Sequence, residues 1–418
     1  MADVAGALPQ ALGKLGVEVL ILMPCYRGMT ALQKKLSRNV SIQFIENEVF
    51  FNRASLYGNE KGDYADNLER FSFFSQEALL TAKAAGFKPD IVHVHDWQTA
   101  LVPVLLKTKF KQDPFFQKTK SLLTVHNLAY QGIFPHRLYQ TMGLGRELFS
   151  MDGFEFYGRI NLLKAGLLYA DWIGTVSPTY AKEIQTKEFG FGLEEVIKKK
   201  VERLTGILNG INTKTWNPAT DSLIKKRFSL KTLESKAVNK KALQKSCGLE
   251  VNAKVPLFGM VTRLAEQKGL ETFTEIADLF LSKKVQFVLL GEGDSVYHTT
   301  FKNIGARHPK NASINLGFKV KDAHSIYAGC DFFLMPSLFE PCGLGQLISL
   351  RYGTVPIVRR TGGLTDTIVD YEDDPRDGNG LTFHGRFSEA FLKTIERGLK
   401  VYEDKQAFRK LQKRGLAA

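Results

Sequence analysis

The sequence predicts an α/β protein with two parallel-sheet domains, and three observations support this prediction. The chain has 418 residues, which is more than one hydrophobic core usually supports. Short β-branched apolar runs alternate with amphipathic stretches, as in parallel sheets covered by helices. This alternation stops and then begins again after Asn217-Pro218, so we expect one sheet in each half of the chain.

Eight apolar runs are predicted to be buried strands, four in each half. They are residues 17–22, 90–95, 121–125 and 171–176, followed by 256–261, 285–290, 331–336 and 355–358. Between the two sets lie a turn-forming Asn209-Gly210 and a polar, lysine-rich stretch that reaches about Lys254. We therefore place the domains at 1–212 and 213–418. Because open α/β sheets bind ligands beyond the carboxyl ends of their strands, two facing sheets predict a site in the cleft between them.

The composition is that of an ordinary globular protein with a basic surface. Hydrophobic residues make up 44% and charged residues 24% of the chain, and the net charge is +14. The positive charge includes the runs 198–200, 225–227 and 240–241, which we interpret mainly as solvated helix faces. The alternative is an anionic partner, and among these a phosphorylated small molecule ranks above a membrane surface or nucleic acid, because no RNA-binding signature is present.

The cysteines and the apolar runs point to a cytoplasmic location. Cys25, Cys247, Cys330 and Cys342 are far apart and form no CxxC pair, which argues against a disulfide framework and a structural zinc site. No apolar run is long enough to cross a bilayer, and the residues after Met1 do not have the pattern of a signal peptide. We expect no membrane association.

The segment 337–346 follows a predicted strand and precedes a helical stretch that reaches about Tyr352. A carboxylate in such a loop, here Glu340, can accept hydrogen bonds from sugar hydroxyls at the top of the sheet. Gly343 and Gly345 allow backbone amides to approach an anion closely. The alternative reading is a helix cap with a solvent-facing glutamate.

The segment 260–270 ends a strand and opens a helix, which brings two cations to the ligand-facing edge of the second sheet. Arg263 can grip a phosphate through two hydrogen bonds and Lys268 can add a point charge. Two surface cations without a role are the alternative. Residues 291–294 contain part of a dinucleotide fingerprint but lack its third glycine, so we interpret them as a turn that ends a strand.

In the first half, residues 93–97 and 124–132 each stand at the carboxyl end of a strand. His93, His95 and Asp96 raise the question of a metal. Both histidines alternate with apolar residues, however, and no further His-Asp pair has metal-site spacing, so structural histidines are the favoured interpretation. We expect no metal.

Taken together, these segments resemble the bacterial glycogen synthase and plant starch synthase family, retaining glucosyltransferases of the GT-B fold with two Rossmann-like domains that face a central cleft. The resemblance covers nearly the whole chain in the family's order. It runs through residues 2–4, 56–58, 63–67, 93–97, 124–132, 177–181, 208–210, 263–269, 339–343 and 359–367.

The resemblance implies a role for each matching residue. In the second half, Glu340 would hold the donor glucose, Arg263 and Lys268 would clamp the diphosphate, and Phe318 would stack on the donor base. The implied sugar and phosphate contacts further include Asn209, Cys342, Gly343 and Leu344. In the first half, His126 would reach the transferred glucose, Asp96 and Tyr57 would line the acceptor side, and Asp3 would belong to the substrate-binding residues.

The implied reaction transfers glucose from ADP-glucose to the non-reducing end of an α-1,4-glucan, with retention of configuration. The partners are therefore a nucleotide-sugar donor and a glycogen-type acceptor, with no nucleic acid and no cofactor. No protein nucleophile is needed, because positioning and stabilisation of the leaving diphosphate supply the rate. Arg263 and Lys268 supply the positive charge that a metal would otherwise provide.

The chain departs from the family pattern at both ends. The family begins with a full strand and a Lys-x-Gly-Gly-Leu loop before the Ala-Asp-Val that is here residues 2–4, and it ends with a helix beyond the last residues present here. We therefore expect the first domain to lack its first strand and a donor-phosphate lysine. Gly345 also replaces a usual hydroxyl residue. The alternative function is a non-catalytic, glucan-binding or regulatory relative that has kept the fold.

Overall fold

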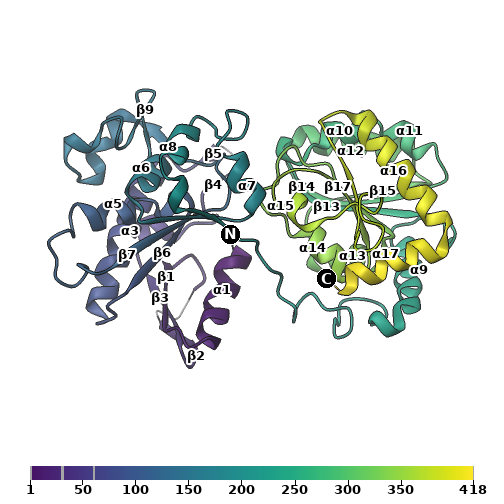
Figure 1. The fold of residues 1–418 in the computed structure, drawn as a ribbon, viewed down its shortest axis with the longest axis horizontal. Coiled ribbons are helices and arrows are strands. Elements are labelled where there is room, and N and C mark those ends of the chain that lie inside the picture. Colours follow the sequence, from purple (N-terminus) through teal and green to yellow (C-terminus); the bar gives the residue numbers. More distant parts are fainter. Residues whose placement is uncertain (1, 30–32, 60–61, 418) are drawn as a thin grey trace. The chain divides into compact units, whose positions relative to one another are not determined.

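The computed structural model describes residues 2–29, 33–59 and 62–417. Contacts divide the chain into two compact units (Figure 1). Unit 1 comprises the residues up to Val176 together with Ala181–Ile207, and unit 2 comprises Ser177–Tyr180 together with the residues from Leu208 onward. The main division lies close to the expected boundary at residue 212. Within helix α7 (Pro178–Glu183) the assignment changes a second time, because Tyr180 belongs to unit 2 and Ala181 to unit 1.

Unit 2 is built on a six-stranded parallel sheet with the order β15-β14-β13-β16-β17-β18. Its strands are β13 Leu257–Leu264, β14 Gln286–Gly293, β15 Ala312–Leu316, β16 Phe332–Met335, β17 Val355–Arg359 and β18 Leu381–Phe383. All four strands expected in this half of the chain are therefore confirmed. One expectation was wrong: residues 291–293 do not form a turn but extend β14, because they pair with Thr262–Leu264 of β13.

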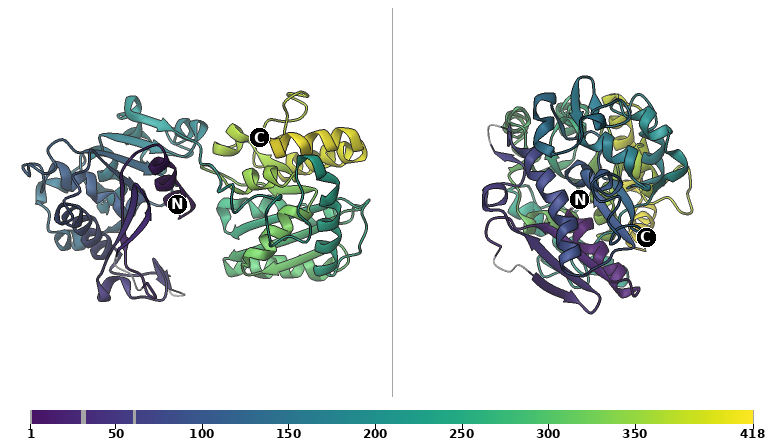
Figure 2. Two further views of the ribbon diagram at one scale, coloured as in Figure 1. Left: turned by 90° about the horizontal axis from the view of Figure 1, so that it is seen from below. Right: turned by 90° about the vertical axis from the view of Figure 1, so that its left-hand side faces the viewer.

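Helices cover both faces of this sheet, as the ribbons in Figures 1 and 2 show for unit 2. They are α9 Lys236–Ser246, α10 Leu270–Thr274, α11 Ala277–Leu281, α12 Ser295–Arg307, α13 Val320–Gly329, α14 Gly345–Arg351, α15 Gly362–Thr367, α16 Ser388–Glu403 and α17 Lys405–Ala417. Successive strand residues enter different cores. Phe258 and Phe332 lie in one buried cluster, whereas their neighbours Leu257 and Phe333 lie in the other, as the alternation of side chains along a strand requires.

The strands of unit 1 form two main sheets instead of the single sheet that we expected. The first has the order β1-β3-β2, with β1 Val19–Pro24, β2 Gln33–Ser37 and β3 Val40–Ile45. The second has the order β12-β11-β7-β6, with β6 Ile91–His95, β7 Lys120–Val125, β11 Trp172–Thr175 and β12 Leu204–Gly206. Among the described residues, β1 pairs only with β3 and β6 only with β7, so no strand joins the two sheets.

Short strands and several helices complete unit 1. The additional strands are β4 Gly58–Asn59, β5 Gly62–Asp63, β8 Ile133–Pro135, β9 Glu155–Phe156 and β10 Arg159–Asn161. The helices are α1 Ala2–Lys14, α2 Glu48–Phe51, α3 Asn67–Ala84, α4 Asp96–Thr99, α5 Leu101–Lys107, α6 Leu162–Tyr169 and α8 Glu194–Lys198. Helix α3 contacts β1 and β3 of one sheet and also α4 and α5 beside the other. No described helix is long and apolar enough to cross a bilayer.

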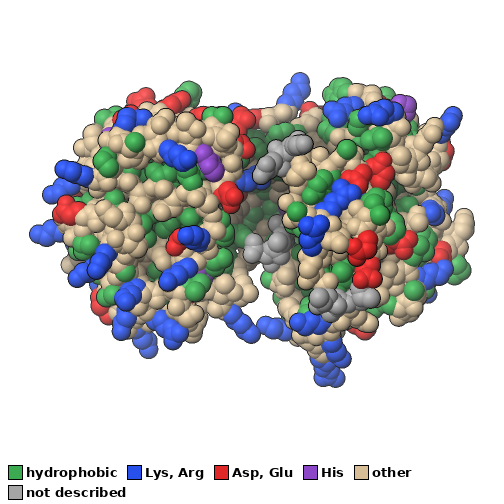
Figure 3. Space-filling view, turned by 180° about the vertical axis from the view of Figure 1, so that it is seen from behind, with side chains coloured by type: hydrophobic (Ala, Val, Ile, Leu, Met, Phe, Trp, Pro, Cys, Tyr) green, Lys and Arg blue, Asp and Glu red, His purple; other side chains and the backbone are tan. Residues whose placement is uncertain are grey.

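Lysine and arginine side chains are scattered over the face in Figure 3 rather than gathered in one patch. The interpretation of residues 240–241 as a solvated helix face was nevertheless wrong for Lys240, which is 6% exposed. Its Nζ lies 2.6 Å from Asp331 Oδ2 and donates to Val255 O and Tyr402 Oη. These partners satisfy the ammonium group, which is why a lysine can be buried at this position.

Candidate active site

Glu340 and Lys268 form an ion pair in unit 2, with Lys268 Nζ 2.7 Å from Glu340 Oε2. Ser337 Oγ donates to the same carboxylate oxygen at 2.9 Å. Glu340 is 6% exposed, so its interpretation as a solvent-facing helix cap was wrong. A buried carboxylate requires compensation of this kind, and the lysine and the serine provide it. Sequence reasoning missed Ser337, although a hydroxyl three residues before Glu340 was visible in the motif.

The pair is assembled by two loops that approach each other closely. One loop follows β13 through the 3₁₀ turn η5 (Glu266–Lys268), and the other follows β16. Leu338 N donates to Gln267 O at 2.9 Å. Gly269 separates Lys268 from α10 with φ +61, and a Cβ at this position would collide with the carbonyl oxygen of Pro336. Only glycine fits both constraints.

A second close approach holds the backbone around Glu340. Gly363 N, at the start of α15, donates to Glu340 O at 3.1 Å. A Cβ on Gly362, which has φ +43, would collide with the same carbonyl oxygen. Gly343 has φ +72, and Leu344 immediately precedes α14. The glycines of both segments therefore allow the loop of the predicted sugar and phosphate contacts to lie directly against α15.

Cys342 is buried beside Asn209 in unit 2. Burial raises the pKa of the Cys342 thiol to about 11, and hydrogen bonds with Asn209 act in the opposite direction. The thiol is therefore neutral at physiological pH and cannot serve as a nucleophile of the thiolate type. The structure thus brings two residues of the predicted sugar contacts together.

Arg263 and Phe318 are exposed residues at the same end of the sheet of unit 2. Arg263 lies in β13, pairs in register with Glu292 of β14, and donates from Nη2 to Gln267 Oε1 at 3.3 Å. Phe318 follows β15 and is 59% exposed. Gly317 directly before it has φ +113, a conformation that lets the chain turn as it leaves the strand. An exposed ring of this kind can accept a flat ligand group by stacking.

Unit 1 contains a cluster of histidines at the carboxyl ends of β6 and β7. His95 Nδ1 lies 3.0 Å from His126 Nε2, and His93 Nε2 lies 2.7 Å from Thr124 Oγ1. Asp96 has φ +54, an uncommon conformation for a residue with a side chain, and its Oδ1 accepts from His126 N at 2.7 Å. The strained aspartate therefore fixes the backbone of His126 while His95 holds its ring.

Burial controls the charge of this cluster. It lowers the pKa of His126 to about 3 and that of His95 to about 2, so both rings are neutral near pH 7. Burial also raises the pKa of Asp96 to about 6, against the hydrogen bond from the His126 amide. The two neutral rings, with His95 Nδ1 3.0 Å from His126 Nε2, can form one hydrogen bond in which one ring nitrogen donates and the other accepts. Within the described ranges, no group of three or more His, Cys, Asp or Glu side chains is arranged to hold a metal ion.

Tyr57 lies in the same unit and is half-buried. Burial raises the pKa of its hydroxyl, and the charge of Asp96 acts in the same direction. The Tyr57 ring centroid lies 6.0 Å from that of Phe71. Asp3 belongs to the first turn of α1, and its side chain lies outside the described part of the structure. The roles given to these residues remain predictions.

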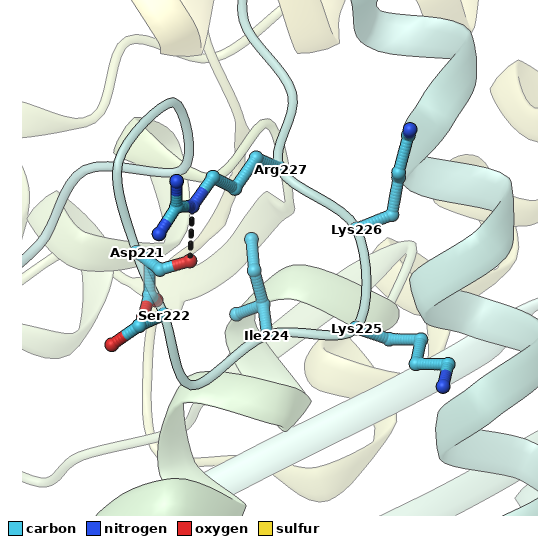
Figure 4. A pocket seen from close by; sticks show the side chains of 6 residues that line it. All are labelled: Asp221, Ser222, Ile224, Lys225, Lys226 and Arg227. Atoms are coloured by element: carbon cyan, nitrogen blue, oxygen red, sulfur yellow. Dashed lines mark hydrogen bonds between the residues drawn. The ribbon is translucent and has the colours of Figure 1, made fainter.

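A surface pocket of about 340 Å³ lies elsewhere in unit 2 and contains none of the predicted site residues. Asp221, Ser222, Ile224, Lys225, Lys226 and Arg227 line it. Figure 4 shows Lys225 and Lys226 pointing away from Arg227, so the three cations do not converge on one point. The Asp221 carboxylate is engaged by His324 Nδ1 at 2.7 Å and by Tyr352 Oη at 2.6 Å. This pocket is therefore not the candidate active site.

Two family models match the chain, one in each half. Residues 1–199 match the starch synthase catalytic domain, and residues 245–414 match glycosyl transferases group 1. The chain is 44% identical over 440 residues to a glycogen synthase from Syntrophotalea carbinolica, a match that covers all of this chain and 91% of that protein. It is 43% identical over 432 residues to a glycogen synthase from Thermosipho melanesiensis, covering 97% of this chain and 89% of that protein.

Solved structures give the same fold. The catalytic domain of starch synthase IV from Arabidopsis thaliana, bound to ADP and acarbose, superimposes with a TM-score of 0.90 at 33% identity, covering 100% of this chain and 91% of that chain. A sucrose-phosphate synthase from Thermosynechococcus elongatus gives a TM-score of 0.63 at 16% identity, covering 98% and 87%. The second likeness concerns the fold alone.

Proposed function

The chain belongs to the glycogen and starch synthase family of glycosyltransferases, and we propose that it transfers glucose from ADP-glucose to the non-reducing end of an α-1,4-glucan. Two of its relatives are glycogen synthases that match it over nearly their full length. The starch synthase IV structure holds ADP and acarbose, which supports an adenine nucleotide and a glucan-like ligand for this chain. A cytoplasmic location is part of the same proposal.

The observation that carries the proposal is the Lys268–Glu340 pair beside the glycine-rich loop of unit 2. The Glu340 carboxylate can accept hydrogen bonds from the hydroxyls of the donor glucose, and the amides around Gly343 can meet its phosphates. Lys268 and Arg263 offer positive charge to the departing diphosphate. Phe318 then stacks on the adenine. Asn209 contributes at the outer hydroxymethyl group of the glucose.

Unit 1 contributes groups for the transferred sugar and the acceptor. His126 presents a neutral ring whose Nε2 lies 3.0 Å from His95 Nδ1, and its Nδ1 is assigned to a hydroxyl of the transferred sugar. Asp96 and Tyr57 line the acceptor side, and Asp3 is assigned to substrate binding. Because these side chains position neutral hydroxyls, they need not ionise during transfer.

In the proposed reaction, configuration is retained without a protein nucleophile. The acceptor hydroxyl attacks the anomeric carbon from the face that the diphosphate leaves, and its proton passes to a leaving phosphate oxygen. The glycosidic bond to the new acceptor forms as the bond to the diphosphate breaks. The rate arises from positioning and from stabilisation of negative charge on the leaving group by Lys268 and Arg263. No metal or other cofactor is required by this scheme.

Transfer of labelled glucose into glycogen tests the proposal, with ADP-glucose and UDP-glucose compared as donors. The Glu340→Ala variant should retain less than a tenth of the activity, while its circular dichroism shows that it remains folded. Glu389→Gln, at an exposed carboxylate paired with Lys393, is the matched control and should be fully active. A protein that binds glycogen but transfers no glucose from either donor would instead be a non-catalytic relative.

A further inference from the structure

Two tight turns of unit 1 hold aromatic residues in a backbone conformation that aromatic residues rarely adopt. Strands β9 and β10 are joined by Tyr157-Gly158, with φ +49 and +74. Phe191-Gly192 has φ +49 and +82, and Leu193 N donates to Gly190 O at 2.8 Å to close the second turn. Turns with two positive φ angles strongly favour asparagine or glycine at the first of these positions.

The two turns pack against each other. A Cβ built on Gly192 would lie 3.0 Å from Phe156 Cζ and 3.9 Å from Tyr157 Cε2, so its backbone touches both rings. The ring centroids of Phe156 and Tyr157 are 4.7 Å apart, edge to face. Tyr157 is 82% exposed and Phe191 is 38% exposed. We call Tyr157 and Phe191 the aromatic platform.

Folding stability does not explain the tyrosine of the platform. A residue with a side chain in the left-handed region costs about 1 kcal/mol or more, and burial of the ring could offset that cost. Tyr157 is almost fully exposed, so burial of its ring offsets little of the cost of the left-handed conformation. Asparagine would suit this turn better. Backbone strain that is not offset by side-chain packing is typical of ligand-binding positions.

A buried amide ties the platform to the loop that carries His126. Gln131 Nε2 donates to Phe191 O at 3.1 Å, and Gln131 Oε1 accepts from Asn161 Nδ2 at 2.6 Å. Asn161 is the last residue of β10, whose other end joins the Tyr157 turn. Gln131 is 5% exposed, so this connection is shielded from water. Figure 1 shows β9, which enters the Tyr157 turn, at the top of unit 1.

We propose that the aromatic platform is a second binding surface for the α-glucan, separate from the predicted transfer site. Aromatic rings stack on the C–H faces of glucose, and this contact needs no charge. Both strained residues are aromatic and neither is basic, which favours a neutral sugar polymer over a phosphorylated partner. The inference rests on the proposed function, which supplies the α-glucan as the polymer at hand. A long chain that reaches both surfaces would be held more tightly than either surface alone allows.

Glycogen-containing native gels, run without donor, test the platform. Tyr157→Asn and Phe191→Asn remove a ring while placing a favoured residue at the strained position. Because Phe191 is only 38% exposed, urea unfolding first checks that each variant is folded. Each variant should bind glycogen about five- to tenfold more weakly, since a stacked ring contributes on the order of one tenfold step in affinity. Tyr157→Phe keeps the ring and should bind normally. Phe387→Ala, at a 77% exposed aromatic residue of unit 2, is the control and should also bind normally.

Kinetics separate this surface from the transfer site. With glycogen as acceptor, the two asparagine variants should show a raised KM and an unchanged kcat, whereas with maltotriose both parameters should stay unchanged. Unaltered glycogen binding by both variants would contradict glucan binding at the aromatic platform and leave the proposed function unaffected. If the asparagine variants also lose transfer to maltotriose, the two rings belong to the transfer site, and the proposal of a separate binding surface is wrong. If the unsubstituted protein transfers no glucose, the proposed function fails, and the gel assay still reports on the platform.

Discussion

Lys268 Nζ lies 2.7 Å from Glu340 Oε2 although 72 residues separate them in the chain. The lysine side chain is 21% exposed and the glutamate side chain 7% exposed, so the cation lies at the boundary between solvent and protein. Because the carboxylate and Ser337 fix the site in advance, the ammonium group needs little reorganisation to meet a phosphate.

Lys268→Ala should lower kcat far more than it weakens glycogen binding, because the acceptor is neutral and the leaving group is a diphosphate. A lost charge-assisted contact to the leaving group corresponds to roughly 2 to 4 kcal/mol, or about 30-fold to several hundred-fold in rate. Turnover with ADP-glucose and sedimentation with glycogen measure the two effects. Lys393→Ala, at a 70% exposed side chain, is the control. Equal losses of turnover and of glycogen binding would show that Lys268 does not act on the diphosphate.

Phe318→Ala should weaken ADP binding. The ring is 59% exposed and can stack on adenine, and stacking of a base on an aromatic side chain is worth about 1 to 3 kcal/mol. We expect the Kd for ADP in calorimetry to rise about tenfold, with unchanged glycogen binding. Val320→Ala, at a 55% exposed apolar residue two positions along the chain, should leave the Kd as it was. Unchanged ADP affinity in Phe318→Ala would place the base elsewhere.

Lys240→Met should destabilise unit 2 strongly. The substitution leaves the Asp331 carboxylate, whose side chain is 10% exposed, without its cation. Removal of one partner from a buried pair costs about 3 to 5 kcal/mol. Urea unfolding followed by intrinsic fluorescence measures the effect. The neighbouring Lys241 is exposed, so Lys241→Met is the matched control and should change the free energy of unfolding by about 0.5 kcal/mol or less.

Acid should destabilise unit 1. His95 and His126 have folded pKa values of about 2 and 3, and burial also lowers the pKa of His93, whereas an unfolded histidine has a pKa of about 6.5. Below pH 6.5 the unfolded chain therefore binds more protons, so stability falls towards pH 4. Asp96, with its pKa raised to about 6, has the opposite sign, since its contribution is lost as the pH rises through 6.

Three histidines outweigh one aspartate in this window. Hydrogen exchange of β6 and β7, followed between pH 7 and 4.5 after correction for the intrinsic rate, should show falling protection. Asp96→Asn keeps a side-chain oxygen for the His126 amide but removes the opposing titration, so its loss of protection should be steeper. A shallower loss in this variant would contradict the sign of the Asp96 contribution.

Patterns along the chain predicted the eight strands, because an apolar, β-branched run is a local signature that does not depend on its neighbours. The predicted burial was wrong for β1 and β6, each of which has one buried residue. Contacts between distant segments were not predictable. Nothing in residues 240–241 distinguishes the buried Lys240 from the exposed Lys241, since the difference lies in Asp331, 91 residues away. The same holds for the ring contact of His95 with His126, which depends on the pairing of β6 with β7. The division of unit 1 into two sheets also depends on strand pairing rather than on any single run.

The separate sheets of unit 1 have a consequence for handling the protein. Strands β1 and β6 each present one edge along which no described strand pairs, and β1 is almost entirely apolar. Such an edge is a template for strands from other molecules. Intermolecular association should therefore begin in unit 1, grow with concentration and appear first on mild heating. Light scattering against protein concentration would then rise earlier than any loss of the sheet in unit 2.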